Sequence, residues 1–91
     1  MREVNDMFHI ENERLVKTSN NQPIPDDEPV FIIRGRDKLA LGIIGYYMGL
    51  SETLGSPEQR IEQLNQVLVK FQKYTDTHSD KMKVPGSTLG K

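Results

Sequence analysis

A helix stop followed at once by a helix start constrains this 91-residue chain more than any other feature. Gly55 suits the left-handed conformation that ends many helices, because it has no Cβ. The next four residues, Ser56-Pro57-Glu58-Gln59, supply a capping serine, a proline at the first helical position and a glutamine at the third. This pattern predicts a capping box. Two helices joined by so short a link run antiparallel, so the sequence predicts an αα-hairpin.

Apolar spacing sets the extent of the two helices. Downstream of Pro57, apolar residues recur every three or four positions and predict one helix to about residue 76. The stripe comprises Ile61, Leu64, Leu68, Phe71 and Thr75, and Val67 and Tyr74 widen it. Upstream, Asp37 suits the N-cap of a helix that runs to about Leu54, because its carboxylate can accept hydrogen bonds from first-turn amides.

The residues before the first helix predict β-structure. Residues 29–34 (PVFIIR) are rich in β-branched and aromatic side chains and predict a strand; since both of its sides are mainly apolar, we expect both to be covered. Residues 7–18 predict a short hairpin or an isolated strand, and residues 19–28 a loop. We expect an α+β protein with a single domain over residues 7–76, an unanchored end at 1–6 and a mobile polar tail at 77–91.

Composition favours self-association. The hydrophobic fraction is 35%, and the chain has no cysteine for a disulfide or a thiolate metal site. A core this thin is commonly completed by a second copy, so we expect a homo-oligomer. No apolar run approaches the ~20 residues that span a bilayer, and no signal peptide is visible, which favours a cytoplasmic location. The net charge is -1 and the sequence shows no broad basic face, so extended DNA binding is not expected.

The junction RGRDK between the predicted strand and the first helix is the main candidate site. A helix start offers free amides and a positive dipole end, two arginines add bidentate hydrogen bonds, and glycine permits close approach, so the junction suits a phosphate or carboxylate. Its ligand-binding candidates are Arg34, Gly35, Arg36 and Lys38. Alternatively, the basic residues pair with the acidic residues at 26–28 and Asp37 occupies the cap.

Glycines and tyrosines in the first helix are further candidates. Gly42, Gly45 and Gly49 share one helical face, at a cost of about 2–3 kcal/mol relative to alanine. Another backbone, within the fold or across subunits, or a flat ligand group would compensate, and we assign these glycines to an interface. Tyr46 and Tyr47 point about 100° apart, so one is expected in the core. The other is expected at a rim, where it could stack on a base or cover a subunit contact.

Catalytic motifs are missing from the sequence. No nucleophile-elbow, Walker or dinucleotide fingerprint occurs. His9 and His78 have no second ligand at a regular spacing, and the acidic residues at 26–28 lack the spacing of a calcium loop. We therefore expect a non-catalytic protein without a metal or cofactor.

The segment from Pro23 to Ala40, PIPDDEPVFIIRGRDKLA, resembles a pattern in short proteins of phages and other mobile elements. The shared features are a proline-acid run before an extended E-P-V-F segment, and R-x-x-D-x-L-A at the opening of a helix. The resemblance covers about a fifth of the chain and assigns no activity. Small phage proteins are often oligomeric inhibitors of host immunity, including sponges for nucleotide signals, so the resemblance implies such an anti-defence role by analogy.

Two functions remain open from these observations. In the first, a homo-oligomer binds a small nucleotide, with Arg34, Arg36 and Lys38 on the phosphate and Tyr46 or Tyr47 stacked on the base. In the second, the helical hairpin offers an apolar groove to a host protein, and the chain acts as an inhibitor or a small regulatory subunit. The concentrated basic junction favours the first hypothesis.

Overall fold

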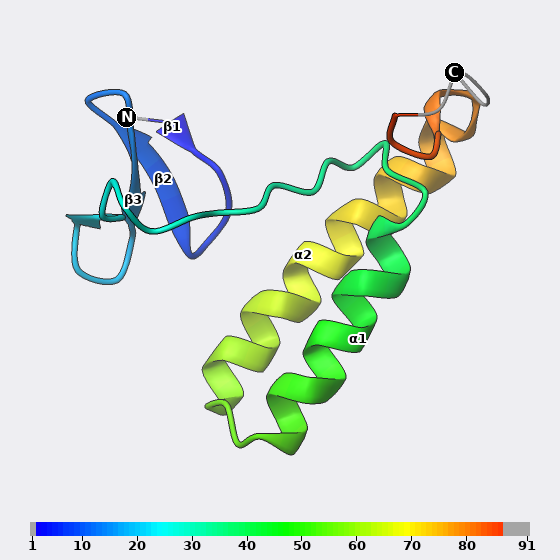
Figure 1. The fold of residues 1–91 in the computed structure, drawn as a ribbon. Helices are drawn as coiled ribbons and strands as arrows, with labels where there is room; N and C mark the ends of the chain where they lie inside the picture. Colours follow the sequence, from blue (N-terminus) through cyan, green and yellow to red (C-terminus); the bar gives the residue numbers. More distant parts are fainter. Residues whose placement is uncertain (1, 87–91) are drawn as a thin grey trace. The chain divides into compact units, whose positions relative to one another are not determined.

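The computed structural model describes residues 2–86 and confirms the α+β class, with strands followed by a C-terminal helical hairpin (Figure 1). Where the sequence predicts one domain over residues 7–76, the contacts divide the chain into two compact units, Met1–Phe31 and Ile32–Lys91. None of the helices in the described part is long and apolar enough to cross a membrane.

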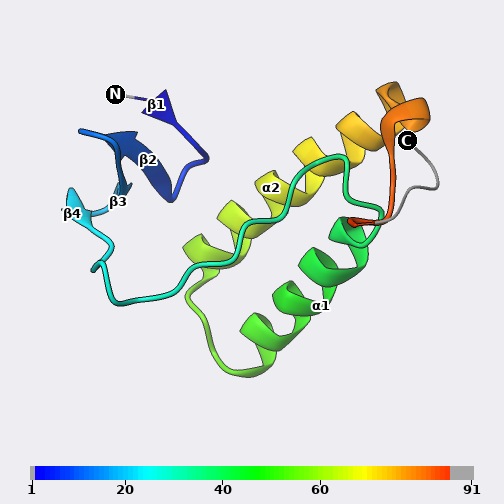
Figure 2. The same ribbon diagram turned by 45° about the horizontal axis from the view of Figure 1, so that its top comes forward.

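The first unit is a four-stranded antiparallel sheet in the order β1-β2-β3-β4 (Figure 2). Its strands are β1 (Arg2–Glu3), β2 (Phe8–Glu11), β3 (Arg14–Lys17) and β4 (Gln22–Pro23). The hairpin predicted within residues 7–18 is confirmed as β2 and β3. The N-terminal end, predicted to be unanchored, instead pairs Arg2 with Ile10 and Glu3 with His9.

The turn of the β2–β3 hairpin explains why its register is well defined. Asn12 and Glu13 are the two turn residues, with φ of 53° and 63°. Two left-handed residues make the turn that matches the twist of antiparallel strands. Beyond the turn, His9 and Val16 are register partners and both are buried. The buried core of this sheet is therefore very small.

The predicted strand over residues 29–34 is wrong. The segment has no regular structure, and Phe31 and Ile32 are 85% and 78% exposed. No amide from residues 30–33 donates a hydrogen bond within the described residues. β-propensity reflects packing against neighbouring strands, and the described chain supplies no such neighbour to this segment.

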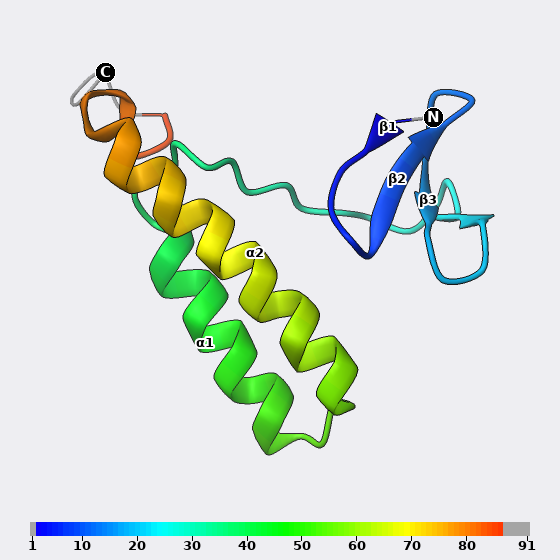
Figure 3. The same ribbon diagram turned by 180° about the vertical axis from the view of Figure 1, so that it is seen from behind.

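The second unit is an antiparallel hairpin of α1 (Ala40–Thr53) and α2 (Glu58–Thr77), which lie side by side (Figure 3). Its link confirms Gly55 as the left-handed terminator, with φ of 85°. The amide of Ser56 donates to Ser51 O at 2.8 Å and that of Gly55 to Glu52 O at 3.2 Å. These two bonds form a Schellman motif, which satisfies carbonyls at the end of α1.

The predicted capping box at the start of α2 is wrong. The helix begins at Glu58 with Pro57 at the N-cap, and no side chain caps it. Ser56 therefore lies one residue too early for its hydroxyl to accept from the first turn, because the Schellman motif includes it in the end of α1. The first helix also begins two residues later than predicted, with its N-cap at Leu39 instead of Asp37.

The segment after α2 packs on the hairpin where the sequence predicts a mobile tail from residue 77. A short 3-10 helix, η1 (Ser79–Lys81), is followed by the buried Met82. The amide of Lys83 donates to Arg36 O at 3.0 Å, and that of Lys38 donates to Lys83 O at 2.9 Å. These two bonds anchor the loop before α1. The rest of the predicted tail, 87–91, lies outside the described residues.

Candidate functional site

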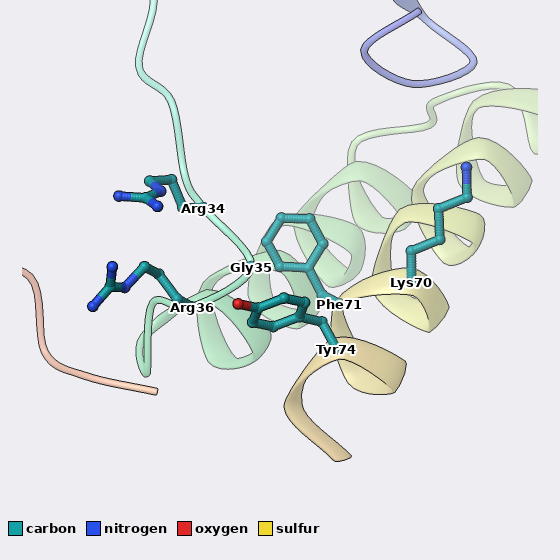
Figure 4. A pocket seen from close by; sticks show the side chains of 6 residues that line it. All are labelled: Arg34, Gly35, Arg36, Lys70, Phe71 and Tyr74. Atoms are coloured by element: carbon teal, nitrogen blue, oxygen red, sulfur yellow. The ribbon is translucent and has the colours of Figure 1, made fainter. Parts of the chain in front are cut away.

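A hollow of about 330 Å³ lies where the loop before α1 meets the C-terminal half of α2 (Figure 4). The antiparallel hairpin brings these two segments together, because the end of one helix lies beside the start of the other. Three of the lining residues belong to the loop and three to α2. They are Arg34, Gly35, Arg36, Lys70, Phe71 and Tyr74.

Gly35 sets the distance between the loop and α2. A Cβ built on Gly35 would lie 3.4 Å from Cγ of Tyr74, so a larger side chain would meet the tyrosine ring. Hydrogen bonds hold the loop on either side: the amide of Asp37 donates to Arg34 O at 3.0 Å, and Arg36 O accepts from Lys83. The glycine predicted to permit close approach thus faces an aromatic ring of the second helix.

The arginines at the hollow are unpaired. Figure 4 shows the guanidinium groups of Arg34 and Arg36 on the same side of Gly35, with the hydroxyl of Tyr74 directed toward that side. Within the described residues, neither guanidinium has an ion pair or hydrogen bond, and the buried Nε of Arg36 lacks a partner. Within the first unit, Asp26 pairs with Arg14 at 2.8 Å; pairing of the two arginines with the acidic residues at 26–28 stays an untested alternative.

Three of the amides near the start of α1 already have acceptors, those of Lys38, Leu39 and Ala40. The amide of Leu39 donates to Oδ1 of Asp37 at 2.7 Å, and the amide of Ala40 donates to Asp37 O at 3.1 Å. The amide of Lys38 is taken by Lys83 O. These three amides are therefore not available to an anion, and the side chains of Arg34 and Arg36 line the hollow beside them.

The hollow combines positive charge with aromatic surface. Three of its six lining residues carry a cationic side chain and none carries an acidic one. Arginine forks bind phosphate and carboxylate groups in a bidentate manner, and aromatic rings stack on flat rings. The side chain of Lys70 lies on the other side of Phe71 from the arginines (Figure 4). The arrangement therefore fits a ligand with an anionic group next to a planar one.

Three predicted ligand-binding residues do not line this hollow. Lys38 is exposed, and only its backbone joins the loop. Tyr46 and Tyr47 are 71% and 58% exposed on α1, so the prediction that one of them is a core residue is wrong. The face of α1 that packs on α2 instead buries Ala40 and Ile44.

Sequence reasoning missed the aromatic half of the site, because it assigned Phe71 and Tyr74 only to the core stripe of the second helix. A signal existed in the predicted topology. An antiparallel hairpin brings the last turns of its second helix beside the start of its first, and those turns carry Lys70 next to Phe71.

The glycine row faces open space. Gly42, Gly45 and Gly49 are exposed, and a Cβ built on any of them meets nothing within 4 Å. The sequence analysis allowed that another backbone within the fold packs on these glycines and offsets their cost. No such contact is observed in the described residues. The assignment of these glycines to an interface between subunits stays a prediction.

The two histidines have structural partners. Nδ1 of His9 lies 2.9 Å from Thr18 Oγ1, and its Nε2 lies 3.1 Å from Glu11 Oε2. His78 stacks on Tyr74. Among residues 2–86, no group of three or more candidate ligands could hold a metal ion. A second hollow, beside His9, is lined by Glu3 and Asp6, whose charges would repel an anion.

Comparisons with family models, curated proteins and solved structures found no match for this chain.

Proposed function

We propose that this chain is a non-catalytic binding protein that holds a small nucleotide in the hollow between the loop 34–36 and α2. One observation carries the proposal: three cationic side chains and two aromatic rings line one hollow, and none of its lining residues is acidic. Arg34 and Arg36 would bind the phosphate through their forks. Phe71 and Tyr74 would offer a surface to the base.

The size of the hollow limits the ligand. Small-molecule pockets measure about 300–1,000 Å³, and this one, at about 330 Å³, is at the lower end. It suits one nucleotide unit of a ligand and not an extended strand. The lining contains no carboxylate, thiol or imidazole, and besides the arginines its only titratable side chains are those of Lys70 and Tyr74. We assign these two side chains to binding.

The proposal extends the roles expected from the sequence. Sequestration of a signal requires that the nucleotide is retained. We therefore include the anti-defence role and the cytoplasmic location in the proposal, and both of these rest on the sequence alone. Self-association of the chain belongs to it as well.

Calorimetry with the purified chain tests the proposal. The panel comprises AMP, cyclic mono-, di- and trinucleotides, and ADP-ribose. We expect the double variant Arg34→Ala/Arg36→Ala to lose at least tenfold in affinity for the ligand that binds, since a hydrogen bond to a charged group contributes about 1.5–3 kcal/mol. The affinity should also fall as salt is raised.

Lys38→Ala is the matched control, because it removes an exposed cation that does not line the hollow. Its affinity should stay within about twofold of the unmodified chain, because an exposed charge outside the lining of the hollow contributes little. Silence across the panel from folded protein, or an equal loss in the control, contradicts the proposal.

A further inference from the structure

Helix α1 has no polar face. Between Ala40 and Thr53 it carries one charged residue, Glu52, in its last turn. The side that packs on α2 buries Ala40 and Ile44, and most of the remaining residues are apolar and exposed. A helix that is apolar all round is normally buried all round. Within the described part of the second unit, α1 is covered on only one side.

The exposed apolar residues of α1 form a continuous row. Their spacing of four, three, four and four residues keeps them on one side of a helix with 3.6 residues per turn. The row, hereafter the α1 stripe, consists of Ile43, Tyr46 and Leu50 within α1 and of Leu39 and Leu54 at its two caps, with Tyr47 alongside. It extends along the whole helix and includes the 83% exposed Leu54.

Helix α2 is different, which makes the α1 stripe a specific feature. The exposed positions of α2 carry charges of both signs, namely Glu58, Arg60, Glu62, Lys70, Lys73 and Asp76. Only Val69 stands out as a large exposed apolar side chain on α2. The hairpin therefore has one solvated helix and one helix that lacks a cover.

We propose that the α1 stripe is the contact surface of a homodimer, in which α1 of one copy packs on α1 of the other about a two-fold axis. The two hairpins would form a four-helix arrangement. The stripe exposes on the order of 700 Å² per copy, and a standard interface buries about 800 Å² per partner. The available area thus matches what a stable dimer needs.

The charge pattern favours a second copy over other partners. A two-fold contact places the same face against itself, so a face that carries charges of one sign repels its own copy. The α1 stripe contains none. A membrane surface is disfavoured, because interfacial helices carry lysine and arginine on a polar face, and α1 has neither residue.

The small core of the hairpin also favours a homodimer. In the described part of this unit, four apolar side chains are buried, those of Ala40, Ile44, Leu64 and Met82. A second copy would bury six more per chain, two of them tyrosines, which are enriched in interfaces. None of the six residues lining the hollow belongs to the α1 stripe, so this inference stands apart from the nucleotide proposal.

Sedimentation velocity over a wide concentration range, with light scattering, tests the dimer on the full chain. Leu50→Glu places a charge in the α1 stripe and is expected to raise the dimer dissociation constant by on the order of a hundredfold. The matched control Val69→Glu makes the same kind of change at a 58% exposed position on α2 and should leave the dissociation constant within about twofold. Circular dichroism checks that both variants are folded.

If Leu50→Glu does not fold, Leu50→Gln replaces it. For that variant we expect helix content that rises with protein concentration, because folding and pairing are then coupled. A monomeric unmodified chain, a Leu50→Glu dimer as tight as the unmodified one, or an equal loss in Val69→Glu overturns the proposal. So does a monomer that co-sediments with phosphatidylcholine vesicles, which would assign the stripe to a membrane surface.

Discussion

The ring of Tyr74 stacks on the ring of His78, with centroids 4.2 Å apart and planes 10° from parallel. The same tyrosine lies against Gly35 and lines the hollow. Tyr74 therefore connects three segments of the second unit: α2, the turn that follows it and the loop before α1. Its orientation depends on a residue that does not line the hollow.

His78→Ala should destabilise the second unit by about 0.5–1.5 kcal/mol, the contribution of a stacked aromatic pair. The loss also removes the contact of His78 Nδ1 with Thr77 Oγ1 at 2.8 Å. Urea denaturation followed by circular dichroism measures the change. His78→Phe keeps a ring in place and should retain most of the stability; an equal loss in both variants would show that stacking contributes little.

Gly35→Ala and Gly35→Val form a matched pair at the hollow. The alanine methyl fits at ordinary contact distance from Tyr74, whereas valine adds methyl groups that the ring must make room for. We expect little change for alanine, and for valine a loss of about 1–3 kcal/mol of stability from overpacking. Valine should also weaken ligand binding. Denaturation and calorimetry check both effects, and equal behaviour of the two variants would contradict this geometry.

Gly55→Ala should cost about 1–2 kcal/mol, because a residue with a Cβ is strained at the φ of 85° found there. Gly45→Ala should instead stabilise the hairpin by about 0.5–1 kcal/mol, since this glycine lies within α1 and its Cβ would enter open space. Thermal and urea unfolding compare the two variants. A Gly55→Ala variant that is more stable than the unmodified chain would contradict this geometry of the helix end.

Glu13→Gly should stabilise the β2–β3 hairpin by about 0.4–1 kcal/mol. Its φ of 63° is strained for glutamate, and Asn-Gly is the preferred pair in this type of turn. Amide hydrogen exchange in β2 and β3 is the suitable measurement, because it reports on the first unit separately from the helices. Glu11→Gly, a change within β2, should increase exchange; slower exchange there would contradict the assignment.

Half of the hollow was predictable from the sequence. Arg34, Gly35 and Arg36 were candidates because basic residues flank a glycine just before a helix. The aromatic half was predicted on the wrong helix, at Tyr46 and Tyr47. Spacing indicates which residues share a face of a helix, but not which face meets its neighbour.

The sequence by itself determined the features that depend on short-range interactions. Gly55 ends a helix because, without a Cβ, it adopts the required φ without strain, and apolar spacing defines α2 because the helical period is local. The tertiary structure decided the features that need a partner far along the chain. Residues 29–34 did not become a strand, because a strand needs another strand beside it. The segment after α2 is anchored because Lys83 meets Arg36, a pairing that no local pattern encodes.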